Sequence, residues 1–313
     1  MSLGSSPHLA SIHIYPLKSG RAVDLPGSRV EPWGLAGDRR WLVVDDTGRF
    51  VTQRAEPALA LVTAGYVPAA PAAGGPASGP LAAGALTLSA PGRPVLTVPA
   101  PAQERGAEML WVTVWSSRVR AAAAGDCADE WLSRFLGRAV RLVHLDDPTR
   151  RGVDPEFGAP ADRVSFADGY PLLLTTAGSL DALGRWLVAE GQPPVPMNRF
   201  RPNVVVAGAA AWAEDGWRRI QIGTVTFRVA KPCGRCVVTT IDQETAQRGR
   251  QPLDLLGRRR RFGQQLVFGQ NVIPDAPGTI RVGDRVQILD EADRPPAGGH
   301  AVIHSDVTSA AGT

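Results

Sequence analysis

The stretch Lys231-Pro232-Cys233-Gly234-Arg235-Cys236-Val237-Val238-Thr239-Thr240-Ile241-Asp242 is the most informative part of this chain. It contains two of the three cysteines, Cys233 and Cys236, among cationic side chains. Cationic neighbours favour the thiolate, which is the form of cysteine that attacks electrophiles and binds soft metals. The β-branched run over 237–241 is typical of a strand. We therefore expect a reactive thiol pair that leads into a strand.

Four interpretations of the cysteine pair compete. A thioredoxin-like Cys-x-x-Cys motif normally opens a helix, whereas this pair precedes an expected strand. A structural zinc site needs four ligands, and neither Cys127 nor any of the five histidines lies near the pair in the sequence. The thiols can also be small buried hydrophobic groups, or one of them can bind a soft, high-valent metal such as molybdenum. The residues of the stretch alone leave the choice open.

The composition is that of an ordinary soluble enzyme. The chain has 313 residues, with 44% hydrophobic and 20% charged residues, which is enough for two domains with a sizeable core. No apolar stretch approaches the ~20 residues of a membrane-spanning helix, and the first residues lack the features of a signal peptide. Three cysteines suit a reducing compartment. We expect a cytoplasmic protein that does not interact with membranes.

The chain is moderately basic, with a formal net charge of +4. The densest basic run is Arg258-Arg259-Arg260-Arg261. It reads either as a solvated loop or as a docking surface for an acidic electron donor, because positive patches steer anionic partners. No aromatic platform or nucleic-acid motif accompanies it, so we expect no nucleic-acid partner.

The pattern of apolar residues predicts many short strands and two amphipathic helices. Helices are expected from Asp126, as a cap, to about residue 136, and over a segment that ends near Glu190, with Gly191 as a stop signal. A loose Ala/Gly/Pro-rich loop is expected over 64–84. Besides 237–241, the expected strands are 13–16, 41–45, 59–63, 86–88, 110–115, 140–145, 172–174, 203–207, 219–222, 225–229 and 285–289.

Seven short motifs in order give the chain a family resemblance. They are Ile14-Tyr15-Pro16-Leu17-Lys18-Ser19-Gly20, Gly34-Leu35-Ala36-Gly37-Asp38-Arg39-Arg40-Trp41-Leu42-Val43-Val44-Asp45, Val51-Thr52-Gln53-Arg54-Ala55-Glu56-Pro57, Asn198-Arg199-Phe200-Arg201-Pro202-Asn203, the Cys233 to Asp242 run, Val267-Phe268-Gly269-Gln270-Asn271 and Pro277-Gly278-Thr279-Ile280-Arg281-Val282-Gly283-Asp284. Together they resemble the MOSC family with its N-terminal β-barrel domain. The subgroup that the chain is most similar to is the mitochondrial amidoxime-reducing component and its bacterial relatives.

The resemblance implies a mainly β fold with a few helices, of the α+β class. A β-barrel-like N-terminal domain over 7–142 is expected to pack on a MOSC-type β-barrel over 143–290. The polar, Pro/Gly-rich segment 146–163 reads as a domain boundary or an active-site loop. Residues 291–313 are expected to form a disordered tail.

The resemblance also implies a molybdenum-molybdopterin cofactor, with Cys236 as the metal ligand and Cys233 as its neighbour. A phosphate is well bound by an ammonium, a hydroxyl and guanidinium groups. The expected cofactor-binding residues are Lys18, Ser19, Arg39, Arg54, Arg201, Asn203 and Thr240. Asp242 is expected either to act in catalysis, by relaying a proton or hydrogen-bonding the cofactor, or to form a turn. It would share one strand face with Thr240.

The implied activity is the reduction of N-hydroxylated compounds from N–OH to N–H. Three cysteines are too few for a plant-type [2Fe–2S] motif, so electrons are expected from a separate protein such as a ferredoxin-type [2Fe–2S] protein. Two alternatives remain. One is a sulfur-transfer module that carries a persulfide on Cys233 or Cys236, and the other is a non-catalytic carrier of the cofactor.

Overall fold

The computed structural model describes residues 6–67 and 85–292. The expected loop over 64–84 and tail over 291–313 lie mostly outside the described residues. In their described parts, residues 64–66 belong to strand β6 (Thr63–Tyr66) and Glu291 ends strand β19 (Val286–Glu291). The expectation of a mainly β chain with a few helices is confirmed.

A nine-stranded sheet forms the larger part of the fold. Its order is β19-β14-β15-β17-β12-β13-β1-β2, with β16 paired to β17. The strands other than β19 are β1 (His8–Ile14), β2 (Val23–Leu25), β12 (Leu172–Thr176), β13 (Val204–Ala207), β14 (Trp217–Ile222), β15 (Val225–Gly234), β16 (Arg261–Phe262) and β17 (Gln265–Pro274). The first strand of the chain, β1, thus pairs with β13 from the second half as well as with β2. The split expected at 142/143 stays a prediction.

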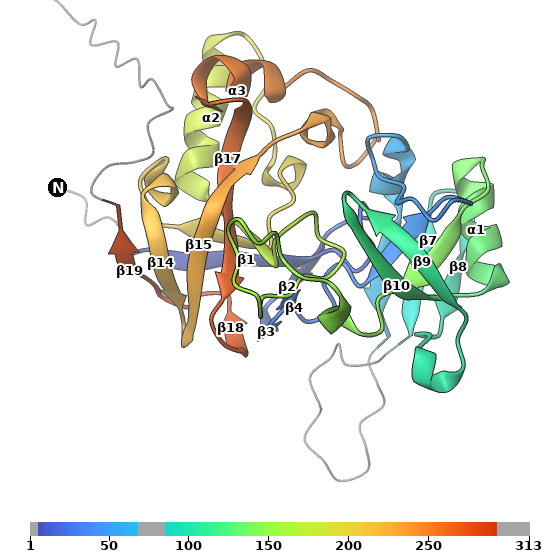
Figure 1. The fold of residues 1–313 in the computed structure, drawn as a ribbon. Helices are drawn as coiled ribbons and strands as arrows, with labels where there is room; N and C mark the ends of the chain where they lie inside the picture. Colours follow the sequence, from blue (N-terminus) through green and yellow to red (C-terminus); the bar gives the residue numbers. More distant parts are fainter. Residues whose placement is uncertain (1–5, 68–84, 293–313) are drawn as a thin grey trace, which may run out of the picture.

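Three smaller sheets complete the β structure. Their orders are β5-β11-β10-β9, β18-β3-β4 and β6-β7-β8. Strands β7 to β10 and helix α1 gather at one end of the molecule, and α2 and α3 lie together at the other (Figure 1). The bounds are β3 (Gly27–Glu31), β4 (Gly34–Leu35), β5 (Trp41–Val44), β7 (Leu86–Ala90), β8 (Arg93–Val98), β9 (Met109–Val114), β10 (Ser117–Ala123), β11 (Arg141–His144) and β18 (Gly278–Arg281).

Both helices expected from the sequence are present. Helix α1 (Asp126–Leu136) buries Trp131 and Leu132 against the core under β11, but its N-cap is Gly125, so Asp126 is the first helical residue and not the cap. Helix α2 (Ala177–Ala189) is capped at its N-terminus by Thr176, whose hydroxyl accepts a hydrogen bond from the Ser179 N–H. It crosses over between β12 and β13, which are parallel and therefore need such a connection.

Two expectations about other segments were wrong. Residues 59–63 do not form a strand, because Pro57, with its fixed φ, opens a 3₁₀ turn over Pro57–Leu61. The basic run is not a solvated loop. It ends helix α3 (Leu253–Arg259), and Arg260 is buried in an ion pair with Asp215 at 2.6 Å.

None of the helices within residues 6–67 and 85–292 has the length and apolar character to cross a membrane.

Gly269 lets β12 and β17 approach each other. It has φ +81, and a Cβ atom there would lie 2.6 Å from the Leu174 carbonyl oxygen and 2.8 Å from a Thr175 methyl. Only glycine adopts this conformation and also leaves that space free. The Val267 to Asn271 motif therefore includes glycine for a packing reason.

Gly269→Ala is expected to lower the free energy of unfolding by roughly 2–4 kcal/mol, through backbone strain and overlap with β12. Gly283→Ala is the matched control, since Gly283 also has positive φ, at +92, but has open space around it. It should cost roughly 1 kcal/mol. Urea unfolding measures both, and equal losses would contradict the contact argument.

Glu214 is a buried carboxyl beside α2. Its Oε2 accepts hydrogen bonds from the Thr176 and Ser179 hydroxyls at 3.0 and 2.9 Å. Burial raises the pKa of Glu214 to about 7, the Ser179 hydrogen bond opposes this, and the neighbouring Asp215 charge adds to it. The folded protein therefore binds more protons than the unfolded chain between pH 4.5 and 7, and this group lowers stability as pH rises through that window.

Glu214→Gln removes this titration. The variant should match wild type below pH 4.5 and be more stable at pH 8, by up to roughly 3 kcal/mol. Thermal unfolding across pH measures the difference. Glu104→Gln, at an exposed position, is the control and should leave the profile unchanged. A pH-independent effect of Glu214→Gln would contradict the assignment.

Candidate functional site

The residues expected to form the site converge on one cavity of about 160 Å³. The segment after β1, the turn at Arg39, the 52–54 turn, the 167–170 loop, the 200–203 segment and the Cys233 to Val238 segment all line it. Of the expected site residues, it brings together Lys18, Ser19, Arg39, Arg54, Arg201, Asn203 and Cys236. The cavity therefore draws on both halves of the chain.

Two arginines lie against the ring of Tyr15. Their guanidinium carbons are 4.4 Å (Arg39) and 4.2 Å (Arg201) from the ring centroid. The Tyr15 hydroxyl donates to the Pro202 carbonyl at 3.1 Å, and burial raises the pKa of Tyr15 to about 12. The ring thus remains neutral and fixed, as a platform for two positive charges.

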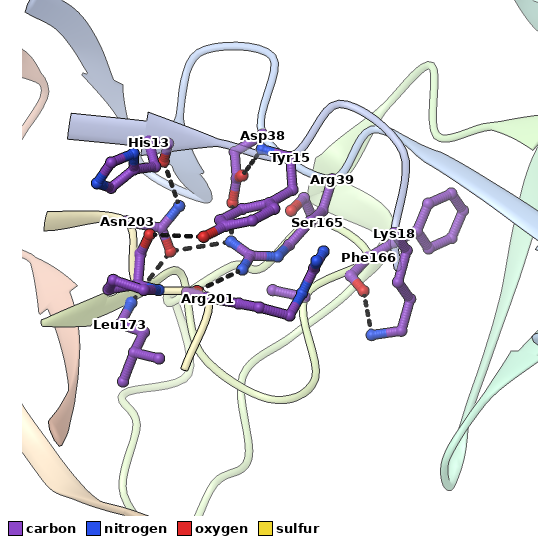
Figure 2. Close-up of polar contacts among 12 residues, drawn as sticks. His13, Tyr15, Lys18, Asp38, Arg39, Ser165, Phe166, Leu173, Arg201 and Asn203 are labelled. Atoms are coloured by element: carbon purple, nitrogen blue, oxygen red, sulfur yellow. Dashed lines mark hydrogen bonds and ion pairs between the residues drawn. The ribbon is translucent and has the colours of Figure 1, made fainter. Parts of the chain in front are cut away.

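Asn203 and Asp38 hold the first of these arginines in place (Figure 2). Arg39 donates to Asp38 Oδ2 at 2.5 Å and to Asn203 Oδ1 at 2.9 Å. The Asn203 side chain also donates to the His13 carbonyl and accepts from the Leu173 N–H. Because Asn203 is 1% exposed, this amide positions the arginine from inside the core.

Lys18 reaches the opposite part of the cavity. It is 5% exposed, and its ammonium donates to the Phe166 carbonyl at 2.7 Å and to Asp168 at 2.5 Å. Burial lowers the pKa of Lys18 to about 8, although Asp168 partly opposes the shift. The ammonium is therefore incompletely stabilised by the protein and would gain from an added anion.

Asp168 was not anticipated from the sequence. Although 62% of the Asp168 side chain is exposed, desolvation at this site raises its pKa; the charge and hydrogen bond of Lys18, together with Arg54, outweigh this and lower the pKa well below the usual range. Arg151 supports the loop by donating to the Ser165, Ala167 and Asp168 carbonyls. The segment expected as an active-site loop ended at Arg163, and it offered no signal that pointed to Asp168.

Each thiol of the cysteine pair has its own arginine. Arg54 Nη2 lies 3.1 Å from Cys236 Sγ, and Arg235 Nη1 lies 2.9 Å from Cys233 Sγ.

The prediction of a strand over 237–241 was wrong. Strand β15 ends at Gly234, and Val237–Thr240 forms a 3₁₀ turn in which the Thr239 and Thr240 hydroxyls donate to carbonyls three residues earlier. These local hydrogen bonds compete with the strand that β-branched residues favour.

Thr240 and Asp242 do not line the cavity. With the strand absent, they do not share a strand face. Asp242 forms the turn: burial raises its pKa, but hydrogen bonds from the Glu244 and Thr245 N–H groups outweigh this and lower it. It also pairs with Arg199 at 2.9 Å. The functional roles expected for both residues stay predictions, without support from the cavity.

Two glutamines join the parts of the site, and the sequence analysis did not select them. Gln53 donates to the Ser19 carbonyl and pairs with the Gln243 amide, which also accepts from Arg201. Gln53 is fully buried and Gln243 is 5% exposed. Gln53 stands beside Arg54 in a motif quoted above, so its place in the site had a sequence signal.

Several residues that line the cavity have a strained backbone conformation. Three non-glycine residues of the cavity have positive φ, namely Ser19 at 68°, Arg39 at 46° and Arg201 at 56°. Such conformations cost roughly 1–3 kcal/mol each and are typical of functional sites. The strain turns the three side chains into the cavity at the expense of stability.

The cavity carries an excess of positive charge. Among its lining residues, Asp168 is the single carboxylate. The cationic residues are Lys18, Arg39, Arg54, Arg201 and Arg235. This donor set suits an anion, and the Cys236 thiol beside it suits a soft metal.

Both halves of the chain match known domain families. Residues 6–139 match the MOSC N-terminal beta barrel domain, and residues 161–287 match the MOSC domain. The chain is 30% identical over 300 residues to mitochondrial amidoxime-reducing component 1 from Homo sapiens, covering 90% of this chain and 83% of the relative. It is 31% identical over 288 residues to the Danio rerio protein of that name, covering 87% of this chain and 82% of the relative.

A second kind of relative is the molybdenum cofactor sulfurase from Danio rerio. It is 30% identical over 312 residues, which are 93% of this chain and 36% of the sulfurase. The alignments with both kinds of relative cover about nine tenths of this chain. The chain therefore belongs to the MOSC family, in the group that combines a MOSC N-terminal beta barrel domain with a MOSC domain.

Proposed function

We propose that this protein binds a molybdenum-molybdopterin cofactor and reduces N-hydroxylated compounds with electrons from a separate protein. The observation that carries the proposal is the single cavity in which the Cys236 thiol and five cationic side chains meet one carboxylate. Relatives named for amidoxime reduction support the substrate class.

The residues fit the anionic part of such a cofactor. Lys18, Arg39 and Arg201 bring ammonium and guanidinium donors to one space, as phosphate binding requires. Within the described residues, Arg201 Nη2 is buried and has no hydrogen-bond partner. A buried unsatisfied donor is costly, and an oxyanion would satisfy it.

Cys236 fits the metal. Its thiol is half-buried, lies 3.1 Å from the Arg54 guanidinium and lines the cavity, and a cysteine sulfur is a ligand that soft metals prefer. When bound, the cofactor would supply the two-electron chemistry that converts R–NHOH, two electrons and two protons into R–NH₂ and water. The ionised Asp168 carboxylate, 62% of whose side chain is exposed, can accept a hydrogen bond from a substrate N–H. Its low pKa makes it a poor proton donor.

The electron donor we propose is an acidic [2Fe–2S] protein of the ferredoxin type. Arg258, Arg259 and Arg261 are exposed near the end of α3 and form a basic surface. Such a surface attracts an anionic partner at low ionic strength.

A second candidate function is sulfur transfer, which the sulfurase relative favours. In this case Cys233 or Cys236 would take the outer sulfur of a donor persulfide R–S–SH, which leaves as the thiol R–SH, and each of the two sulfurs has an arginine beside it. Metal content separates the two functions. A non-catalytic carrier would also bind the cofactor, but it would not turn over with a reductant.

Protein made in a molybdate-fed host that synthesises the cofactor should contain about one molybdenum per chain. Cys236→Ala should lose the metal, because it removes the proposed ligand, and Cys233→Ala should keep it. Elemental analysis with pterin fluorescence makes the measurement. Wild-type protein without molybdenum or pterin would sink the reductase proposal and favour sulfur transfer.

Sulfate binding should depend on the protonation of Lys18. A bound anion raises the pKa of this ammonium above its value of about 8, so binding takes up a proton and weakens as pH rises through 8. Calorimetric titration with sulfate between pH 7 and 9.5 should show affinity falling by up to about tenfold per pH unit.

Lys18→Met should bind sulfate weakly and with little dependence on pH. Lys231→Met is the matched control, because Lys231 lies on the Phe157 ring and does not line the cavity. A wild-type affinity that stays constant across this range would exclude Lys18 as part of the anion site.

A further inference from the structure

Trp115 occupies a position that favours glycine. The pairing of Val114 with Ser117 leaves Trp115 and Ser116 as a two-residue loop between β9 and β10. Trp115, the first of the two, has φ +55. Such a loop with positive φ at its first residue prefers glycine, and a bulky side chain there is strained.

Burial does not explain the tryptophan, since Trp115 is 48% exposed. Its contacts point to the site instead. The indole lies on the Arg54 guanidinium at 4.4 Å, and its Nε1 donates to Asp168 at 3.2 Å. Its ring also meets Phe50 edge-on, with centroids 5.1 Å apart.

Arg54 depends on this contact for its position. Among the residues that the structure describes, its guanidinium has no ion-pair partner within 4 Å. Its side-chain contacts are the Trp115 ring and the Cys236 thiol. A stacked cation loses freedom that a solvated arginine would keep, so the indole holds the positive charge beside the sulfur.

We propose that Trp115 is a positioning residue that holds Arg54 against Cys236 from outside the cavity. The strain at Trp115 is then the cost of placing an aromatic ring at this point of the hairpin. The value of this placement for catalysis rests on the proposed function, but the placement itself does not, and it can be tested without the cofactor.

The test compares two alkylating reagents on full-length protein made in a host that lacks molybdopterin. Iodoacetate is anionic and iodoacetamide is neutral, and they are similar in size. The ratio of their rates at one cysteine therefore reports the nearby positive charge, while changes in access largely cancel. Peptide mass spectrometry reads Cys127, Cys233 and Cys236 separately in the same sample.

Trp115→Ala should lower the iodoacetate to iodoacetamide rate ratio at Cys236 roughly fivefold, as expected when one charge leaves contact distance. Arg54→Ala should lower it equally, and the double variant should lower it no further. Trp115→Phe should retain most of the ratio, because it keeps a ring face. The ratios at Cys127 and Cys233 should not change.

Trp111→Ala is the matched control. Trp111 is an exposed tryptophan on β9 that stacks on Arg118 and has no contact with the site residues named above.

Trp115→Leu replaces Trp115→Ala in the test if circular dichroism shows that the alanine variant does not fold. The proposal is overturned if Trp115→Ala or Trp115→Leu leaves the ratio unchanged while Arg54→Ala lowers it, or if the two losses add in the double variant. Metal content plays no part in this readout, so failure here is distinct from failure of the proposed function.

Discussion

The interaction on which the site depends is the buried contact of Arg39 with Asp38, Asn203 and Tyr15. It joins a turn of the first half of the chain to the start of β13 in the second half. Asp38 is 1% exposed and Asn203 equally so, which means that one carboxylate and one amide compensate a charge inside the core. Removing Asp38 would leave the largely buried Arg39 guanidinium without its ion-pair partner, which is strongly destabilising.

This contact has an electrostatic consequence for the cavity. Asp38 pairs with Arg39 and only partly offsets the burial that lowers the pKa of Arg201, on the same tyrosine ring, to about 10. The Asp168 carboxylate raises the pKa of Lys18, but burial lowers it by more, so that the net shift is downward. The protein thus keeps several cations only partly compensated in one space. Such a space favours an anion, because the cost of burying the charges has already been met by the fold.

The cysteine pair shows how far a local pattern can be interpreted. The cationic setting of the thiols was evident from the sequence, and the structure adds that each sulfur has a separate arginine. Arg235 was visible as a neighbour in the motif, whereas Arg54 comes from 182 residues away. The β-branched run after the pair was misread as a strand, because threonine hydroxyls can bond to nearby carbonyls and stabilise a turn. Strand propensity reflects the shape of the side chains and does not include these local hydrogen bonds.

The sequence alone determined the family, the mainly β composition, helices α1 and α2, and the expected site residues of the first five motifs that line the cavity. These depend on local patterns, such as the spacing of apolar residues or the order of short motifs, which are readable one segment at a time. The site contacts of Asp168, Trp115 and Gln243, which pairs with Gln53, became evident only in the tertiary structure. Their importance comes from contacts across 53 to 190 residues of chain, and no local pattern encodes which distant side chain a residue will meet. Loop geometry and burial decided those partners.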